Sequence, residues 1–317
     1  MKSIVVCLGV SLLLNFAKPQ SANAIRLFEE RQFDKAKEAF ENLARQEPRN
    51  AIAHYYLGKL LLMEQFLDAD RAVEMLEKST ALDPTNAEFY YLLGLGISKQ
   101  TQGAGFVRQL FLIPKVKDAM VRAINLDTNY IEAHQMLGRY YQEIPSIYGG
   151  DEQKAWRELE IVTSLDSVRG KIFKAWLLEK REKFDAAEGM LKDLLRTHEH
   201  DWRSWNAFGA FLQRRKSWKE ALPRIQTYAE LRPDTADSHT RLGENMLRLG
   251  DTENAIRQFQ ASLTIDPYAN STLLLLAEAF EQIGGRGKAL EIYKQLAPRK
   301  LRQDQKKIVE RKIKELS

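Results

Sequence analysis

The segment HEHD, residues 198–201, is the group of side chains in this sequence best suited to metal or acid–base chemistry. His198 and His200 lie two residues apart beside a glutamate and an aspartate, and both imidazole and carboxylate groups bind zinc. A zinc site needs further ligands from elsewhere in the chain, and this segment lies at a turn between two helical patterns. A metal-assisted enzyme and a solvated turn both remain open, and we favour the solvated turn.

Motifs of other catalytic classes are absent from the sequence. It contains no nucleophile elbow, phosphate-binding loop, dinucleotide fingerprint or His-Glu-x-x-His motif. The glycine runs at 103–105 and 284–287 follow no strand pattern, so they predict turns. His54, His134 and His239 each lie near the start of a helical pattern, where we expect packed structural side chains. We therefore predict a non-enzymatic protein that uses no cofactor and no metal.

The composition indicates a folded chain with a mild positive charge. Of its 317 residues, 44% are hydrophobic and 29% are charged, as in folded globular proteins. The formal net charge is +5, and Lys2 and Lys18 contribute two of these charges. So small a charge gives no reason to predict nucleic-acid binding.

Residues 1–24 have the features of a signal peptide. Lys2 precedes an apolar stretch, residues 4–14, that is too short to span a bilayer, which needs about 20 residues. Ala22 and Ala24 then form a small-x-small cleavage site. We therefore expect an exported protein, periplasmic or secreted; an uncleaved anchor or a buried first helix is the alternative. The single cysteine is Cys7, so the exported chain would contain no disulfide.

Most of the remaining chain repeats, most clearly with a period of 34 residues. Three columns keep this spacing: a small residue, an alanine and a proline. They are Gly209, Gly243 and Ala277; Ala221, Ala255 and Ala289; and Pro233 and Pro267. Within each unit, apolar residues recur at intervals of three and four, which predicts two amphipathic helices joined by a turn. The small residues should lie where helices cross closely, and each proline should end a second helix.

At these positions the sequence resembles the tetratricopeptide repeat family, whose pattern is an aromatic residue, Leu-Gly, a second aromatic residue, and later Ala, Phe and Pro. Two successive copies are Trp205, Phe208, Gly209, Leu212, Ala221, Ile225 and Pro233, and His239, Leu242, Gly243, Met246, Ala255, Phe259 and Pro267. The resemblance implies an all-α fold, a right-handed superhelical α-solenoid of helix-turn-helix repeats with a C-terminal capping helix.

The predicted organisation has three parts: the signal peptide at 1–24, the repeat array at 25–298 and a basic capping helix at 299–317. The array comprises about eight units, of which the first is truncated. The cap should pack on the last repeat through an apolar stripe. The stripe consists of Leu301, Ile308, Val309, Ile313 and Leu316.

Two stretches exceed the length of a repeat, residues 99–117 and residues 144–153. The first, KQTQGAGFVRQLFLIPKVK, turns from polar to apolar and should interrupt the link between the two helices of the third repeat. The second should emerge at the same edge of the array and touch it. Their apolar side chains would form a small satellite core, a rim of the binding groove, or both. They are Phe106, Leu110, Phe111, Ile147 and Tyr148.

The two inserts together also resemble those of a bacterial group of exported tetratricopeptide proteins. That group carries one long insert and then a Pro-x-x-x-Gly-Gly insert in the next repeat, as the stretches GAGFVRQLFLIPKVKDAMVRAINLD and YYQEIPSIYGGDEQKAW do here. The group has no settled function, so this resemblance implies export and nothing about a partner.

The family architecture implies a concave surface lined by the first helix of each repeat, and hence a scaffold that binds a protein or peptide. Its arginines favour carboxylate groups, because guanidinium pairs with them through two hydrogen bonds. The candidate groove residues are Tyr55, Lys59, Tyr91, Gln135, Arg139, Arg203, Asn206, Arg214, Arg241 and Arg248, with Phe106, Leu110, Phe111 and Tyr148 from the inserts.

An alternative function is assembly of the cell envelope. Eight basic residues and three acidic ones occupy residues 299–317, so this helix would contact acidic lipid or polymer, with at most peripheral membrane association. The apolar stripe of the same helix equally favours a simple soluble cap. The sequence leaves the partner, the pathway and the oligomeric state open.

Overall fold

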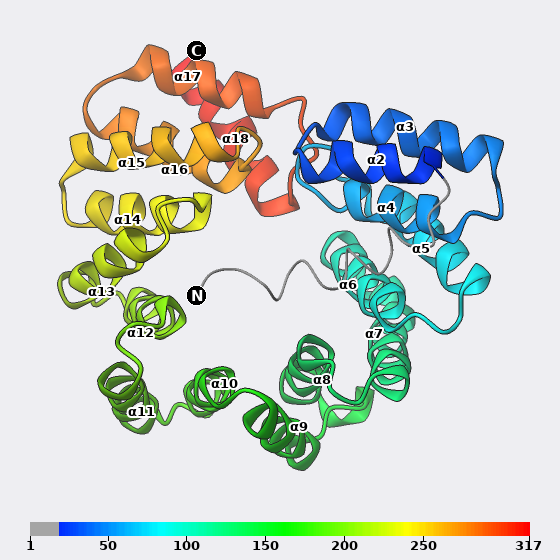
Figure 1. Ribbon diagram of the computed structural model, residues 1–317. Helices are drawn as coiled ribbons and strands as arrows, with labels where there is room; N and C mark the ends of the chain where they lie inside the picture. The colour runs from blue at the N-terminus through cyan, green and yellow to red at the C-terminus, as the bar shows by residue number, and fades with distance from the viewer. Residues whose placement is uncertain (1–18) are drawn as a thin grey trace. The chain divides into compact units, whose positions relative to one another are not determined.

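The computed structural model describes residues 19–317, and every regular element in that range is helical (Figure 1). Residues 1–18, most of the predicted signal peptide, lie outside the described range. The chain divides into two units between Ala133 and His134. No helix within residues 19–317 has both the length and the apolar character to cross a membrane.

The first unit holds three helix pairs. They are α2 (Pro19–Glu29) and α3 (Phe33–Gln46), α4 (Ala51–Leu61) and α5 (Ala69–Leu82), and α6 (Ala87–Gly103) and α7 (Phe106–Leu126). Asn50 and Asn86 cap the first helices α4 and α6, because their side-chain oxygens accept hydrogen bonds from backbone N–H groups of the first turn.

The division between the units falls inside α8 (Ile131–Glu143), and the second unit continues the alternation. Its elements are the 3₁₀ turn η1 (Ser146–Tyr148), α9 (Glu152–Leu165), α10 (Ser167–Lys180), α11 (Phe184–Thr197), α12 (Trp202–Arg214), α13 (Trp218–Leu231), α14 (Ala236–Arg248), α15 (Thr252–Ile265), α16 (Asn270–Gln282), α17 (Arg286–Leu296) and α18 (Gln303–Leu316). Within this unit, α14 and α15 lie side by side, as do α12 and α13 (Figure 1).

The glycine column lies where helices cross, as the repeat spacing predicts. A Cβ atom on Gly209 would lie 2.2 Å from Ile225 Cδ1, and one on Gly243 would lie 2.7 Å from the Phe259 ring. Since a methyl group does not fit at these distances without displacing its neighbour, the glycines allow the second helix of each pair to approach closely.

The alanine column packs into the same crossings. Ala221, Ala255 and Ala289 are completely buried, and so are the corresponding alanines of earlier repeats. The latter are Ala36, Ala72, Ala155 and Ala187. The positions at which repeats need a small side chain were therefore predicted correctly from spacing alone.

The first long stretch, residues 99–117, is helical, so the prediction that it interrupts the helix link was wrong. It extends α6 to 17 residues and α7 to 21, whereas the other α-helices have 11 to 14. α7 continues through Pro114, although proline inside a helix costs about 3 kcal/mol. Burial of Leu112, Val116 and Met120 on one face of α7 offsets this cost.

The predicted satellite core does not form from the aromatic side chains of this stretch. Phe106 is 67% exposed and Phe111 is 71% exposed, while Leu110 is half-buried. Ile147 of the second stretch is 80% exposed. The exposed residues lie on the face of α7 opposite its buried side chains, because helical geometry separates positions 107 and 111 from positions 112 and 116.

The second stretch, residues 144–153, is a compact turn before α9. The Tyr140 hydroxyl donates a hydrogen bond to the Tyr148 carbonyl at 3.0 Å, and Gly149 adopts a left-handed conformation with φ of 95°. Asp151 then caps α9 by accepting a hydrogen bond from the Lys154 amide.

The basic C-terminal segment forms α18 and packs as a cap. Val309 is buried, and Leu301, Ile313 and Leu316 contact the same apolar cluster. Ile308 is 39% exposed, so its assignment to the packed stripe was wrong. Helical spacing explains the difference, because residue 308 lies about 100° around the helix from residue 309.

The predicted cleavage site lies within the structured part of the chain. Cleavage after Ala24 would remove the first six residues of α2 (Pro19–Glu29), including the buried Ser21, which accepts a hydrogen bond from Asn50. Cleavage at this site remains a prediction.

Candidate functional site

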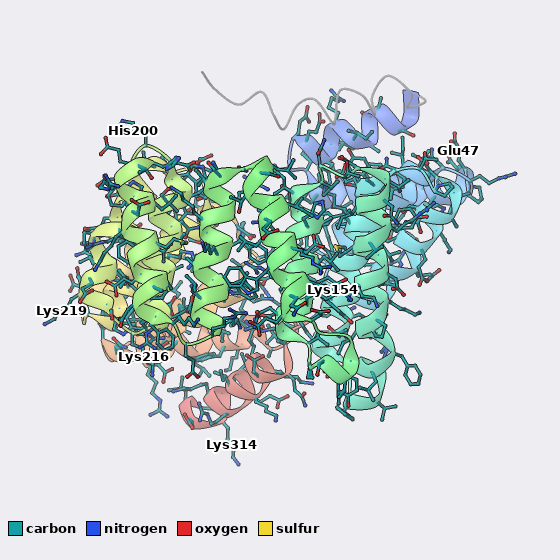
Figure 2. The ribbon with its side chains drawn as sticks, turned by 90° about the horizontal axis from the view of Figure 1, so that it is seen from below. Glu47, Lys154, His200, Lys216, Lys219 and Lys314 are labelled. Carbon is teal, nitrogen blue, oxygen red and sulfur yellow. The ribbon has the colours of Figure 1, made fainter. Side chains whose placement is uncertain are left out.

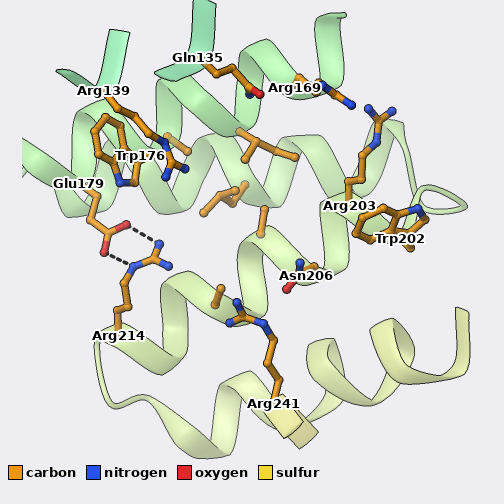
Figure 3. A pocket seen from close by; sticks show the side chains of 15 residues that line it. Gln135, Arg139, Arg169, Trp176, Glu179, Trp202, Arg203, Asn206, Arg214 and Arg241 are labelled. Carbon is orange, nitrogen blue, oxygen red and sulfur yellow. Dashed lines mark hydrogen bonds and ion pairs between the residues drawn. The ribbon is translucent and has the colours of Figure 1, made fainter. Parts of the chain in front are cut away.

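The second unit contains a cavity of about 300 Å³ lined almost entirely by first helices. Its walls come from α8, α10, α12 and α14, and the second helix α11 contributes only Leu191 (Figure 3). Six residues predicted for the groove line it: Gln135, Arg139, Arg203, Asn206, Arg214 and Arg241. The structure thus brings together residues more than 100 positions apart in the sequence.

Three of the lining arginines are occupied by carboxylates of the protein. Arg214 donates two hydrogen bonds to Glu179, at 2.8 and 2.6 Å (Figure 3). Arg241 pairs with Asp237 at 2.9 Å, one helical turn away. Arg203 contacts both Asp166 and Asp201 at 2.6 Å. These guanidinium groups hold adjacent helices together and are poorly available to a ligand.

The Arg203 cluster shifts the pKa values of its carboxyl groups. Partial burial raises the pKa of Asp166 and Asp201, but hydrogen bonds from the Arg203 guanidinium and from backbone amides outweigh it, so both pKa values lie below normal. The same hydrogen bonds raise the pKa of Arg203. All three groups are therefore charged at neutral pH.

Arg139 differs from the other predicted arginines in the cavity. No carboxylate of the described residues pairs with it, and its guanidinium lies over the Trp176 ring, 5.0 Å from the centroid (Figure 3). A guanidinium stacked on an aromatic ring keeps its N–H groups at the edge free to donate. Arg139 is thus the cation in this cavity best placed to meet an incoming anion.

The floor of the cavity is apolar apart from one amide. Ile172, Ala175, Ala207 and Ala210 line it with small and branched side chains. Asn206 lies among them, and its Oδ1 atom is buried without a hydrogen-bond partner in residues 19–317. A buried amide oxygen without a partner is costly, and a ligand N–H group would satisfy it.

The predicted groove residues of the first unit form an internal cluster. Tyr55 is 1% exposed and its hydroxyl makes a short hydrogen bond to Glu88, so it is not available to a partner. The Lys59 amine lies 3.1 Å from the same hydroxyl and 3.7 Å from Glu88. Tyr91 packs on Tyr130 at 5.1 Å between ring centroids. Burial raises the pKa of Tyr55 well above normal, and Glu88 adds to the shift.

Two further predicted residues lie apart from the cavity lining. Arg248 pairs with Glu278 of the next first helix. Tyr148 is 37% exposed and lies in the turn before α9. These two residues have no role in the cavity described above.

The sequence interpretation missed the two aromatic walls of the cavity, Trp176 and Trp202. Trp176 belongs to the degenerate repeat, yet it follows Ala175, which lies 34 residues before Gly209. Extending the 34-residue column by one more repeat would have placed Trp176 beside Arg139. Trp202 packs on Tyr228 at 5.8 Å, with Arg232 on its ring at 4.7 Å.

The histidines have structural contacts. The His54 and His239 rings donate from Nε2 to the carbonyls of Pro48 and Pro233, at 2.9 and 3.0 Å. Trp205 occupies the same slot and donates to the Glu199 carbonyl, also six residues earlier. Each ring N–H therefore satisfies a carbonyl in the turn between repeats, which explains why histidine and tryptophan alternate there.

The HEHD segment is exposed. His200 projects from the turn before α12 with its side chain 95% exposed (Figure 2), and the His198 ring contacts the Thr197 hydroxyl at 2.8 Å. Nowhere in residues 19–317 do three histidine, cysteine, aspartate or glutamate side chains gather as a metal site would require.

Comparison with known proteins places two sequence profiles on the chain. The profile described as Tetratricopeptide repeat matches residues 21–67. The profile described as Bacterial transcriptional activator domain matches residues 178–304. Among curated protein sequences, none matches this chain.

Solved structures resemble the chain in fold. Yeast Tom70 superposes with a TM-score of 0.69 at 16% identity, over 90% of this chain and 58% of Tom70. This chain therefore corresponds to little more than half of Tom70. A tetratricopeptide repeat protein from Parabacteroides merdae ATCC 43184 superposes with a TM-score of 0.55 at 14% identity, over 82% of this chain and 97% of that one.

Proposed function

Because the chain is a tetratricopeptide repeat protein, an all-helical scaffold of the kind that binds other proteins, we propose that it binds a peptide segment in the cavity of the second unit. The observation that carries this proposal is Arg139, a guanidinium with no carboxylate partner that lies over Trp176 at the edge of an apolar floor. The other predicted arginines there are paired, so one anchor point for an anion is available.

The chemistry of the cavity favours an extended peptide with one acidic group. Its carboxylate would accept hydrogen bonds from Arg139, and a backbone N–H group would donate to Asn206 Oδ1. Apolar side chains of the peptide would pack on Ile172 and the neighbouring alanines. This arrangement needs no catalytic group, so the proposed role is that of a non-enzymatic scaffold.

We further propose that binding takes place outside the cytoplasm. The support is the charged, apolar and small-residue pattern of residues 1–24. Cell fractionation with N-terminal sequencing tests this directly. Recovery from the periplasm or the medium would support export, and recovery of the full-length chain from the cytoplasm alone would contradict it.

The match to a bacterial transcriptional activator domain supports a second candidate, a part in transcription regulation. The matched residues 178–304 are helix pairs of the same array, from the end of α10 to the start of α18. This candidate requires the protein to lie in the cytoplasm, so the fractionation above separates it from the first.

A photo-crosslinking amino acid tests the cavity at two positions of α10. Ile172 lines the cavity, whereas Lys174 on the same helix is exposed and does not. In cells, the probe at Ile172 should capture a discrete partner, and Arg139→Gln should reduce capture by about tenfold, as expected when a charge-assisted hydrogen bond is lost. The probe at Lys174 should capture little.

Arg248→Gln is the matched control, because Arg248 is a similar first-helix arginine whose guanidinium pairs with Glu278 outside the cavity lining. It should leave capture at Ile172 unchanged. Equal capture from Ile172 and Lys174, or capture that Arg139→Gln does not alter, would contradict the cavity as the binding site.

A further inference from the structure

The start of α7 carries an unusual concentration of exposed apolar side chains. Within residues 19–317, four large apolar side chains are more than 60% exposed, and three of them lie within six residues of one another. They are Phe106, Val107 and Phe111, at 67%, 67% and 71%. Isolated apolar residues are normal on a protein surface, but a cluster at a helix end marks an interaction site.

The helix that presents these side chains is firmly held. On its opposite face, Leu112 and Val116 are buried. The Gln109 side chain donates hydrogen bonds to the carbonyls of Thr101 and Ala104, at 3.1 and 3.0 Å, and thereby ties α7 to the turn after α6. The exposed cluster is therefore a fixed feature of a helical hairpin whose two helices exceed the others in length.

The exposed stripe of α7 combines apolar and basic side chains in order. Val107, Phe111 and Lys115 are spaced by four residues and share one face of the helix. Each step rises by about 6 Å along the axis. The apolar residues therefore lie at the end of the hairpin, and the amine of Lys115 lies about one turn further back.

The charge of this region has one sign. No aspartate or glutamate occurs from residue 89 to residue 117. Lys115 and Lys117 make no ion pair with the described residues, and Arg108 alone is neutralised, by Asp70 at 2.5 Å. An apolar end with free cations behind it is complementary to a surface that is apolar inside and anionic outside.

We propose that this hairpin end inserts into the interface of a lipid bilayer that contains anionic lipids. Interfacial helices bury their apolar face about 5–10 Å into the boundary between headgroups and acyl chains. Phe106, Val107 and Phe111 reach that depth, and Lys115 and Lys117 then meet the lipid phosphates. A bilayer accepts a convex end without a preformed groove, so the association is peripheral and independent of the peptide-binding cavity.

The test places a polarity-sensitive fluorophore at the hairpin end of the full chain. Cys7→Ser removes the native thiol, and Val107→Cys introduces the labelling site. Vesicles of phosphatidylcholine containing phosphatidylglycerol should shift the emission to shorter wavelength, and pure phosphatidylcholine should do so much less. Lys115→Gln with Lys117→Gln should remove this difference between the vesicles. Phe106→Ser with Phe111→Ser should weaken partitioning at least about tenfold.

Ile283→Cys is the matched control, since Ile283 is 52% exposed but lies at the end of α16 without apolar neighbours of similar exposure. Its label should stay in water with all vesicles. A label at position 107 that also stays in water would overturn the proposal. So would an emission shift that appears without vesicles and grows with protein concentration, because the hairpin end would then bind a second copy of the chain.

Discussion

Single glycines determine how closely the helices of a repeat approach. A Cβ atom on Gly243 would meet the ring of the buried Phe259 at 2.7 Å, whereas one on Gly189 in α11 would meet nothing within 4 Å. The same substitution should therefore have opposite effects at the two positions, because steric overlap decides one case and helix propensity the other.

We expect Gly243→Ala to lower the free energy of unfolding by about 1–2 kcal/mol, since the displaced ring costs more than the gain in helix propensity. Gly189→Ala should raise it by about 0.5–1 kcal/mol. Urea denaturation of both variants checks the prediction. Equal effects of the two substitutions would show that Gly243 does not lie at a tight crossing.

The Arg203 cluster makes stability depend on pH in a defined direction. The pKa values of Asp166 and Asp201 are lowered in the folded chain, with hydrogen bonds from Arg203 outweighing burial. A lowered carboxyl pKa contributes stability above the unfolded pKa, near pH 4, and this contribution is lost as the pH falls through the folded pKa.

Arg203→Gln should therefore cost about 1–2 kcal/mol at pH 7, where both carboxylates lose their partner, and little near pH 2. Arg157→Gln is the control, because Arg157 is exposed and makes no ion pair with the described residues. Chemical denaturation at the two pH values measures the effect. A cost for Arg203→Gln that persists at low pH would exclude the ion-pair explanation.

At the scale of one helix, α18 acts as a cap through a narrow stripe. Val309 is 1% exposed and Ile308 is 39% exposed, although the two residues are adjacent. The Lys312 amine also pairs with Glu281 at 2.7 Å, and the Arg286 guanidinium donates to the carbonyls of Glu315 and Leu316. Much of the predicted basic surface thus serves to attach the helix.

Val309→Ala should lower the free energy of unfolding by about 1–2 kcal/mol, because it leaves a cavity in the last apolar cluster. Ile308→Ala should change it by less than about 0.5 kcal/mol. Thermal unfolding of the two variants distinguishes the residues. Similar losses for both would mean that α18 packs with a different face.

The sequence predicted the helix pairs well and the lengths of α6 and α7 poorly. The 34-residue columns succeed because each position makes the same crossing in successive repeats, as with Ala221, Ala255 and Ala289. The 99–117 stretch failed because Gly103, Gly105 and Pro114 are common signals of a loop. Apolar burial along α7 outweighed those local signals.

The cavity was predicted in part, and the pairing of its arginines was not. Arg214 contacts Glu179, 35 residues earlier, and Arg203 contacts Asp166, 37 residues earlier. These separations are close to one repeat, so facing first helices bring the pairs together. Local sequence patterns reveal which residues point to the groove, but only the stacking of repeats shows which of them are already paired.

At the scale of the whole chain, contacts are made mainly between neighbouring helices. The principal helix contacts join elements that are adjacent or next but one in the sequence. In such arrays, stability is the sum of repeat and neighbour terms, so damage should remain local.

Gly243→Ala should therefore speed amide hydrogen exchange in α14, α15 and α16 and leave α4 to α7 unchanged. Hydrogen exchange followed by mass spectrometry measures this for each helix. Acceleration of exchange throughout the chain would show instead that the repeats unfold as a single cooperative unit.

Oxidative footprinting of the tryptophans tests the central claim, that the cavity of the second unit binds a peptide. Trp176 and Trp202 line the cavity, while Trp156 and Trp218 do not. With the partner captured at Ile172 bound, we predict that oxidation of Trp176 and Trp202 falls severalfold and that of Trp156 and Trp218 stays the same. Unchanged oxidation of Trp176 and Trp202 in the saturated complex would contradict the account.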